Sequence, residues 1–191
     1  MTDAARFLAW LAKILERAGI PYMVTGSLGS TLHGEPRATN DVDVVIDPSE
    51  EQLDALLDSL GEEFYVSLAA AREALKRRGM FNVIDTSSGL KADLIIRKNR
   101  PFSAEEFARR KPTTVQGIEV CAVSAEDAIL SKLEWCKGGQ SERQFRDALG
   151  VAIVQGNKLD VPYLRKWSRE LNVDDLLESL LTEAQKRRSP D

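Results

Sequence analysis

The sequence predicts an α/β fold in which helices flank a mixed β-sheet and a purely helical region follows. Up to about residue 123, short apolar segments with the two-residue period of strands alternate with segments of helical period. From Ser124 onward only helical periodicity remains. We therefore expect two domains, a core over residues 1–123 and a helical region over residues 124–191, packed together without a flexible linker.

Composition excludes several classes of protein. With 191 residues, 43% of them hydrophobic and 29% charged, the chain is typical of a globular protein. Its net charge of −4 argues against a protein that coats nucleic acid without specificity. The two cysteines show no metal-ligand spacing, which favours buried thiols in a reducing compartment. No apolar segment reaches the length of a membrane span, so we expect a cytoplasmic location and no membrane partner.

The expected elements follow from periodicity and from turn residues. The first helix spans residues 3–17, a strand covers 21–25, and Gly26-Ser27 turns that strand into a short helix ending at Gly34. A second strand opens at Asp41, and the spacing of Ser49 and Gln52 predicts a capping box for the next helix. The later elements are a helix over 67–79, a hairpin over 81–97, a helix over 103–110, a hairpin over 113–123, and helices over 124–136, 141–155, 161–171 and 173–187.

Acidic residues on two of these strands suggest a metal site. Strand alternation places Asp41 and Asp43 on one face and Val42 and Val44 on the other. Asp93 lies likewise on a strand that is otherwise apolar. Two carboxylates on one strand face are hard oxygen ligands of the kind that Mg²⁺ prefers, although hydration at a strand end also explains them. Asp93 has the similar alternative of a strand-end aspartate beside its neighbour Lys91.

The Gly26-Ser27 turn adds a candidate phosphate site. Glycine lets a ligand approach the backbone closely, and the N–H groups of a starting helix suit a phosphate. A simple strand-to-helix turn with Ser27 as the N-cap is the alternative. Together with three acidic ligands, such a cradle can hold two Mg²⁺ ions for in-line phosphoryl displacement.

This set of residues resembles the polymerase-β-type nucleotidyltransferase superfamily over roughly residues 5–97. A Gly-Ser turn, an Asp-x-Asp strand and a third acid on a later strand occur in the superfamily's order. The resemblance implies a nucleotidyltransferase fold in which Gly26 and Ser27 hold a nucleoside triphosphate. It implies that Asp41, Asp43 and Asp93 bind the metal ions, and that Asp93 also orients or deprotonates the attacking hydroxyl.

A finer resemblance points to the abortive-infection (AbiEii-like) toxin-related bacterial nucleotidyltransferases. The segment from Arg37 through Thr39 to Asp41 resembles that subgroup, which implies a position near the phosphates for Arg37 and Thr39. An exposed loop arginine is the alternative for Arg37. The helical segments SAEDAILSKL and RQFRDAL resemble the subgroup too, and by that resemblance Lys132 and Asp147 complete the nucleotide site.

Local sequence leaves other interpretations of these two residues open. Lys132 stands where the apolar stripe of its helix required an apolar residue, so its stem either passes the core or carries the ammonium to the site. Asp147 is equally consistent with a surface salt bridge to Arg143.

The predicted function is Mg²⁺-dependent transfer of a nucleoside monophosphate from an NTP such as ATP to a hydroxyl acceptor. An RNA or tRNA acceptor fits the toxin-like resemblance and implies an antitoxin partner. A small molecule such as an aminoglycoside fits the same core and the acidic net charge. The alternative function is a nucleotide-binding or regulatory module that keeps the fold without turnover.

Overall fold

The computed structural model of the chain describes residues 3–34, 41–115, 117–137 and 141–188. These residues form two compact units. The first contains the described residues up to 28 and those from 41 to 122, and the second contains residues 29–34 and those from 123 onward. The helix α2 (Gly26–His33) begins in the first unit and ends in the second. The predicted division into domains at residue 123 stays a prediction.

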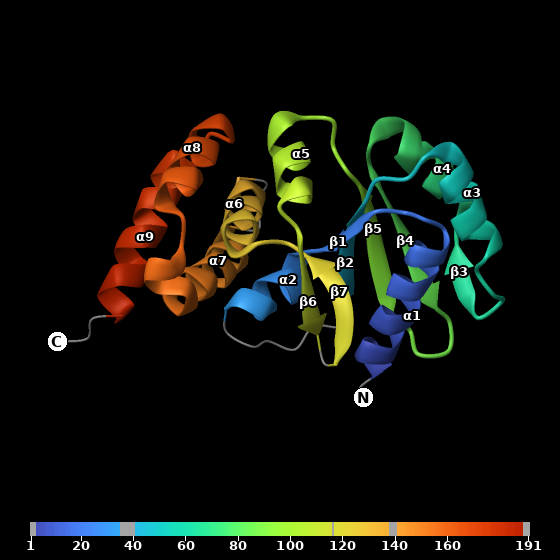
Figure 1. Cartoon of the computed structure of the whole chain (residues 1–191). Coiled ribbons are helices and arrows are strands. Elements are labelled where there is room, and N and C mark those ends of the chain that lie inside the picture. Colours follow the sequence, from blue (N-terminus) through green and yellow to red (C-terminus); the bar gives the residue numbers. More distant parts are fainter. Residues whose placement is uncertain (1–2, 35–40, 116, 138–140, 189–191) are drawn as a thin grey trace. The chain divides into compact units, whose positions relative to one another are not determined.

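A mixed sheet forms the centre of the first unit (Figure 1). In the described part of the chain it has seven strands in the order β3-β4-β5-β2-β1-β7-β6. The strands β2 and β5 pair in parallel, as do β1 and β7, whereas the other neighbours are antiparallel. The strands are β1 (Tyr22–Val24), β2 (Asp41–Ile46), β3 (Phe64–Val66), β4 (Met80–Asp85), β5 (Lys91–Ile96), β6 (Lys111–Val115) and β7 (Ile118–Ala122). The predicted mixed sheet is confirmed.

Local signals explain where the helices of this unit begin and end. These helices are α1 (Asp3–Arg17), α3 (Glu50–Asp58), α4 (Leu68–Arg77) and α5 (Pro101–Ala108). The predicted capping box of α3 is present, with Ser49 Oγ accepting from the Gln52 amide and the Gln52 side chain accepting from the Ser49 amide. The helix α5 starts two residues earlier than predicted, because Pro101 is well tolerated in the first turn of a helix.

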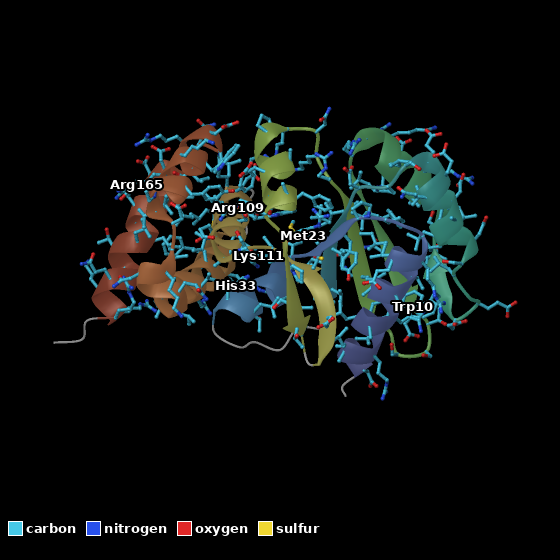
Figure 2. The ribbon with its side chains drawn as sticks, in the orientation of Figure 1. Trp10, Met23, His33, Arg109, Lys111 and Arg165 are labelled. Atoms are coloured by element: carbon cyan, nitrogen blue, oxygen red, sulfur yellow. The ribbon has the colours of Figure 1, made fainter. Side chains whose placement is uncertain are left out.

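One face of the sheet is buried in the core of the first unit. The side chains of Val42, Val44 and Leu94 are at most 3% exposed, which confirms the predicted alternation on β2 and β5. The helix α1 covers part of this face, since the ring of its Trp10 stacks on Phe64 of β3 at a centroid distance of 3.6 Å. Figure 2 shows Trp10 on α1 and Met23 on β1, where Met23 is fully buried in the sheet.

The strand β3 was not predicted from the sequence. Its three residues are too few to show a two-residue period, and they stand between a turn and a helix. The strand forms because it adds to the edge of β4, pairing Tyr65 with Ile84 and Val66 with Val83. Tertiary pairing therefore determines this element, whereas local periodicity determines the longer strands.

The second unit contains the four helices that were predicted for the C-terminal region. They are α6 (Ala125–Cys136), α7 (Ser141–Gln155), α8 (Val161–Glu170) and α9 (Asp174–Arg188), with a short 3₁₀ turn at Gly156–Lys158. Ser124 and Asp160 cap α6 and α8 through side-chain oxygens that accept from backbone amides. The core of the unit includes Leu133, Leu164 and Leu177, all fully buried. Among the described residues, none of the helices combines the length and apolar character needed to cross a bilayer.

Candidate active site

The turn between β1 and α2 lies directly against the carboxylate of Asp43. The Thr25 amide donates a hydrogen bond to the Asp43 carbonyl at 2.9 Å, which fixes the end of β1 beside β2. Gly26 follows with a φ of +63°, and a Cβ atom at this position would collide with Asp43 Oδ2 and Cγ. Only glycine therefore fits both the backbone conformation and the space. This explains why a glycine stands at the turn that the sequence singled out.

Ser27 is the second residue of α2 and is half-buried. The first N–H groups of a helix have no acceptor within the helix and carry a partial positive charge, so they suit an anion. The alternative of Ser27 as the N-cap does not describe its position, because the helix has already begun at Gly26. The helix that contains Ser27 thus begins at Gly26, the residue that lies against the carboxylate of Asp43.

Parallel pairing of β2 with β5 brings the three predicted acids onto one face of the sheet. Asp43 lies opposite Asp93, and Asp41 lies opposite Lys91. These four residues alternate with the buried residues of their strands, so their side chains share the face that is not packed in the core. Asp41 is exposed and Asp43 is half-buried. The juxtaposition that the sequence implied only through resemblance is therefore present in the backbone register.

Two polar side chains that were not predicted to be functional contact the third acid. Lys91 Nζ lies 3.0 Å from Asp93 Oδ1 and 3.1 Å from Oδ2, and Asn82 on β4 donates a hydrogen bond to Oδ1. The side chain of Asp93 is only 13% exposed. The hydrogen bond to Asp93 raises the pKa of Lys91, with the charges of Asp41 and Asp43 acting in the same direction and partial burial opposing them.

The sequence contained a signal for one of these two residues. Lys91 stands two positions before Asp93 on the same strand, so period-2 alternation already placed both on one face. Asn82 could not be found in this way, because its position opposite Asp93 depends on the register of β4 with β5. In a hairpin the turn fixes the register, and here the Asp85 amide donates to the Leu90 carbonyl at 2.9 Å, which alternation within one strand does not show.

The donor chemistry of this face fits a divalent cation. Carboxylates are the ligands that Mg²⁺ prefers, and the missing side chain at Gly26 lets the Asp43 carboxylate lie directly against the turn. Within the described residues, no group of three or more His, Cys, Asp or Glu side chains is already arranged to hold a metal ion. At Asp93 the positive charge beside the carboxylate is the Lys91 ammonium. A metal ion that uses all three acids would therefore require Asp93 to change partners.

The other predicted nucleotide-binding residues fall elsewhere. Arg37 and Thr39 lie outside the described residues. Lys132 on α6 and Asp147 on α7 belong to the second unit and form an ion pair, with Nζ and Oδ2 2.9 Å apart and side chains 7% and 11% exposed. Asp147 is thus not the surface residue that a salt bridge to Arg143 would require. The role of both residues in nucleotide binding stays a prediction.

His33, the only histidine in the sequence, makes two contacts within the second unit. Its Nε2 lies 2.7 Å from the Val123 carbonyl, and its own carbonyl accepts a hydrogen bond from Gln155. These contacts fasten the end of α2 to the start of the helical region and to α7. Of the two cysteines, Cys136 is buried, as predicted, and Cys121 is half-buried.

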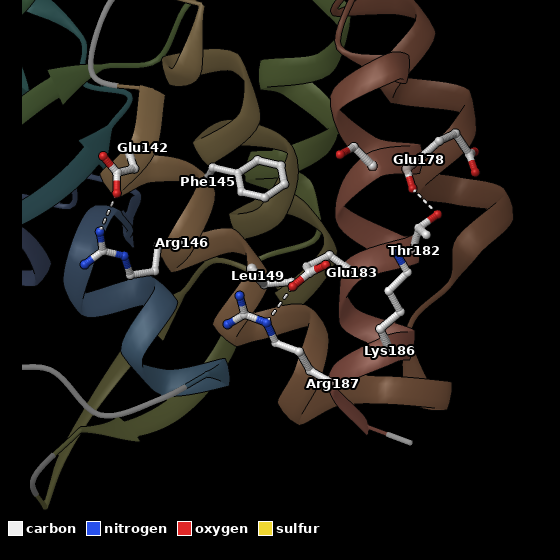
Figure 3. A pocket seen from close by; sticks show the side chains of 10 residues that line it. Glu142, Phe145, Arg146, Leu149, Glu178, Thr182, Glu183, Lys186 and Arg187 are labelled. Atoms are coloured by element: carbon white, nitrogen blue, oxygen red, sulfur yellow. Dashed lines mark hydrogen bonds and ion pairs between the residues drawn. The ribbon is translucent and has the colours of Figure 1, made fainter. Parts of the chain in front are cut away.

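The residues that line a hollow in the second unit include none of the predicted site residues. It has a cavity volume of about 690 Å³ and lies between α7 and α9 (Figure 3). Ion pairs between Glu142 and Arg146 and between Glu183 and Arg187 line it, at 3.1 and 2.8 Å. The two exposed side chains of each pair neutralise one another, so these pairs give the hollow no net charge that would select a ligand.

Comparison with known proteins identifies the fold. No family model and no curated protein matches the sequence. Among solved structures, an antigenic nucleotidyltransferase-like protein from Paracoccidioides brasiliensis is similar with a TM-score of 0.61 and 18% identity, covering 94% of this chain and 92% of that one. The solution structure of the antibiotic-resistance factor ANT(2'')-Ia has a TM-score of 0.58 and 14% identity, covering 93% of this chain and 97% of that one.

A crystal structure of ANT(2'')-Ia in complex with adenylyl-2''-tobramycin is also similar, with a TM-score of 0.56 and 15% identity over 89% of this chain and 98% of that one. Similarity at such low identity concerns the fold. The mixed sheet, its flanking helices and the C-terminal helices therefore form a nucleotidyltransferase-like fold.

Proposed function

We propose that this protein is a Mg²⁺-dependent nucleotidyltransferase that transfers a nucleoside monophosphate from an NTP to a hydroxyl group. The observation that carries the proposal is the register of β2 with β5, which sets Asp43 opposite Asp93 with Asp41 on the same face. The close approach of Gly26 to Asp43 adds a phosphate-binding turn at the same place. A fold shared with nucleotidyltransferases supports this assignment of the acids.

Each residue of this face has a role in the proposed reaction. The backbone of Gly26 and the hydroxyl of Ser27 bind the triphosphate, and Asp41, Asp43 and Asp93 would hold Mg²⁺, as two ions by the superfamily resemblance. The bound metal supplies charge neutralisation on the phosphates and polarises the phosphorus centre. Asp93 orients the acceptor hydroxyl and accepts its proton as the oxygen attacks.

The bonds change at the α-phosphorus of the nucleotide. A bond forms between the acceptor oxygen and the α-phosphorus, and the bond from that phosphorus to the oxygen bridging the α- and β-phosphates breaks. Pyrophosphate leaves with the electron pair of the broken bond, while the hydroxyl proton moves to a carboxylate oxygen of Asp93. The products are the nucleotidylated acceptor and pyrophosphate. We propose that Arg37, Thr39, Lys132 and Asp147 add contacts to the nucleotide, as the toxin-related subgroup implies.

A small hydroxylated molecule is the acceptor class that we favour. The similar protein ANT(2'')-Ia was captured with adenylyl-2''-tobramycin, a nucleotide joined to a small polyhydroxylated molecule. The net charge of −4 would also attract a cationic acceptor. An RNA or tRNA end is the second candidate and implies a toxin with an antitoxin partner. Growth arrest on expression, abolished by Asp43→Asn, would favour the toxin over the small-molecule enzyme.

Transfer is tested with each labelled NTP, Mg²⁺ and two acceptor pools, one of tRNA and one of aminoglycosides. We expect label in one pool with the wild type and none with the double variant Asp41→Asn, Asp43→Asn. The matched control is Asp54→Asn, which removes a carboxylate that is 53% exposed on α3 and paired with Arg72. Mg²⁺-dependent nucleotide binding that persists in the double variant would refute the assignment. Nucleotide binding without transfer to any acceptor would instead support the regulatory module.

A further inference from the structure

The sheet face that carries the three acids also carries a positively charged side chain, that of Lys91. Lys91 lies on β5 in register with Asp41, two residues before Asp93. Its ammonium contacts both carboxylate oxygens of Asp93, at 3.0 and 3.1 Å. Asp41, Asp43 and Asp93 share this face, so the Lys91 ammonium lies on the same face as three carboxylates. A like-charged cluster is favourable only if a positive charge stands among its members.

This ion pair differs from the exposed ion pairs of the helices. Pairs such as Arg146 with Glu142 join side chains that are 72% and 90% exposed, where water competes for both partners. Asp93 is only 13% exposed, and the amide of Asn82 holds its Oδ1 from the neighbouring strand. The carboxylate is therefore fixed in direction while the ammonium occupies both of its oxygens.

The same oxygens are those that a divalent cation would require. A carboxylate oxygen that accepts from an ammonium and an amide has little remaining capacity for a metal ion. The repulsion between the ammonium and a divalent cation at this distance adds to the competition. Lys91 reaches Asp93 through a flexible four-carbon stem and is 38% exposed, so its ammonium can leave without disturbing the strands.

We propose that Lys91 is a tethered counter-cation that holds Asp93 in the absence of metal and is displaced when a divalent cation binds. The residue thereby sets the metal affinity of the site and acts as a positioning residue for the third acid. This inference rests on the proposed function, because it assumes that the three acids bind metal. It predicts that the chain without its lysine binds metal more tightly but is less stable when no metal is present.

Mn²⁺ binding, followed by the electron paramagnetic resonance signal of the free ion, tests the proposal without any catalytic readout. We expect Lys91→Met to bind Mn²⁺ at least about tenfold more tightly than the wild type, because one nearby positive charge is lost. Lys91→Arg should stay within about threefold of the wild type, since it keeps the charge. The matched control is Lys98→Met, an exposed lysine just beyond the end of β5, which should change the affinity less than about twofold.

Thermal unfolding supplies the second readout. Without metal, Lys91→Met should melt below the wild type, and saturating Mn²⁺ should raise its Tm by more than it raises that of the wild type. If methionine prevents folding, Lys91→Gln makes the same test with a polar side chain.

An unchanged or weaker Mn²⁺ affinity in Lys91→Met or Lys91→Gln, with binding still abolished by Asp43→Asn, overturns this inference and leaves the proposed function standing. Absence of Mn²⁺ binding in both the wild type and the Lys91 variants overturns the proposed function and this inference together.

Discussion

Replacing Asp147 by alanine would leave the ammonium of Lys132 inside the second unit without its carboxylate partner. The two side chains are 11% and 7% exposed, and their charged atoms are 2.9 Å apart. Removing one partner of such a buried pair costs about 3–5 kcal/mol, because the remaining charge stays desolvated. For a chain of this size that loss lowers Tm by roughly 6–20 °C.

A double variant separates the ion pair from the rest of the helix interface. Lys132→Met with Asp147→Leu replaces both charges by apolar side chains of similar length, which is often neutral or stabilising for a buried pair. We therefore expect the double variant to unfold near the wild-type temperature or above it. The unfolding free energies come from urea titrations followed by circular dichroism, and the cycle of four proteins gives the coupling energy.

If Asp147→Ala lowered the free energy of unfolding by less than about 1 kcal/mol, the pair would behave like an exposed ion pair. That result would refute the description of Lys132 and Asp147 as a buried pair. Nucleotide affinity, measured on the stable double variant, answers a different question. A loss of ATP binding at unchanged Tm would support the role in the nucleotide site that the toxin-related resemblance implies. Unchanged ATP binding would leave the pair a purely structural link between α6 and α7.

Three further predictions concern the first unit. Gly26→Ala should abolish metal binding and lower stability by more than Gly89→Ala, because both glycines have positive φ but only at Gly26 would the new Cβ meet the carboxylate of Asp43. Burial and nearby Glu16 raise the pKa of Tyr22 to about 12, so absorbance at 295 nm should show a late-titrating phenol that Tyr22→Phe removes. The neutral Tyr22 side chain makes its full contribution to folding stability below a pH of about 10. This contribution is lost as the pH rises toward 12. Ser49→Ala removes a capping box and should cost about 1 kcal/mol in urea unfolding.

Each of these has an outcome that contradicts it. Equal losses in the two glycine variants would mean that backbone conformation alone matters at Gly26. Titration of all three tyrosines near their ordinary pKa would contradict the burial of the Tyr22 hydroxyl. An unchanged urea midpoint for Ser49→Ala would mean that the Gln52 side chain, which also donates to the Gly19 carbonyl at 2.6 Å, keeps the start of α3 in place.

The sequence was informative wherever a signal is local. The alternation of Val42 and Val44 with Asp41 and Asp43 correctly predicted which face of β2 is buried, because a strand must turn successive side chains to opposite sides. The capping box of Ser49 and Gln52 and the turn glycine were equally readable, since they depend on residues a few positions apart. The strand β3 was missed because three residues are too few to show a period and form a strand only by pairing with β4.

The tertiary structure determined which residues each charged side chain contacts. That Asp43 lies opposite Asp93, that Asn82 contacts Asp93, and that Lys132 pairs with Asp147 depend on contacts between residues 11 to 50 positions apart. Local propensity cannot specify such contacts, because a shift of one residue in strand register would move these side chains to the other face without changing either strand's own pattern. The sequence by itself thus determined the elements, the acids of the candidate site and the shared strand face of Lys91 and Asp93, whereas only the register of the folded sheet determined that Asp41 and Asp43 lie opposite those two residues.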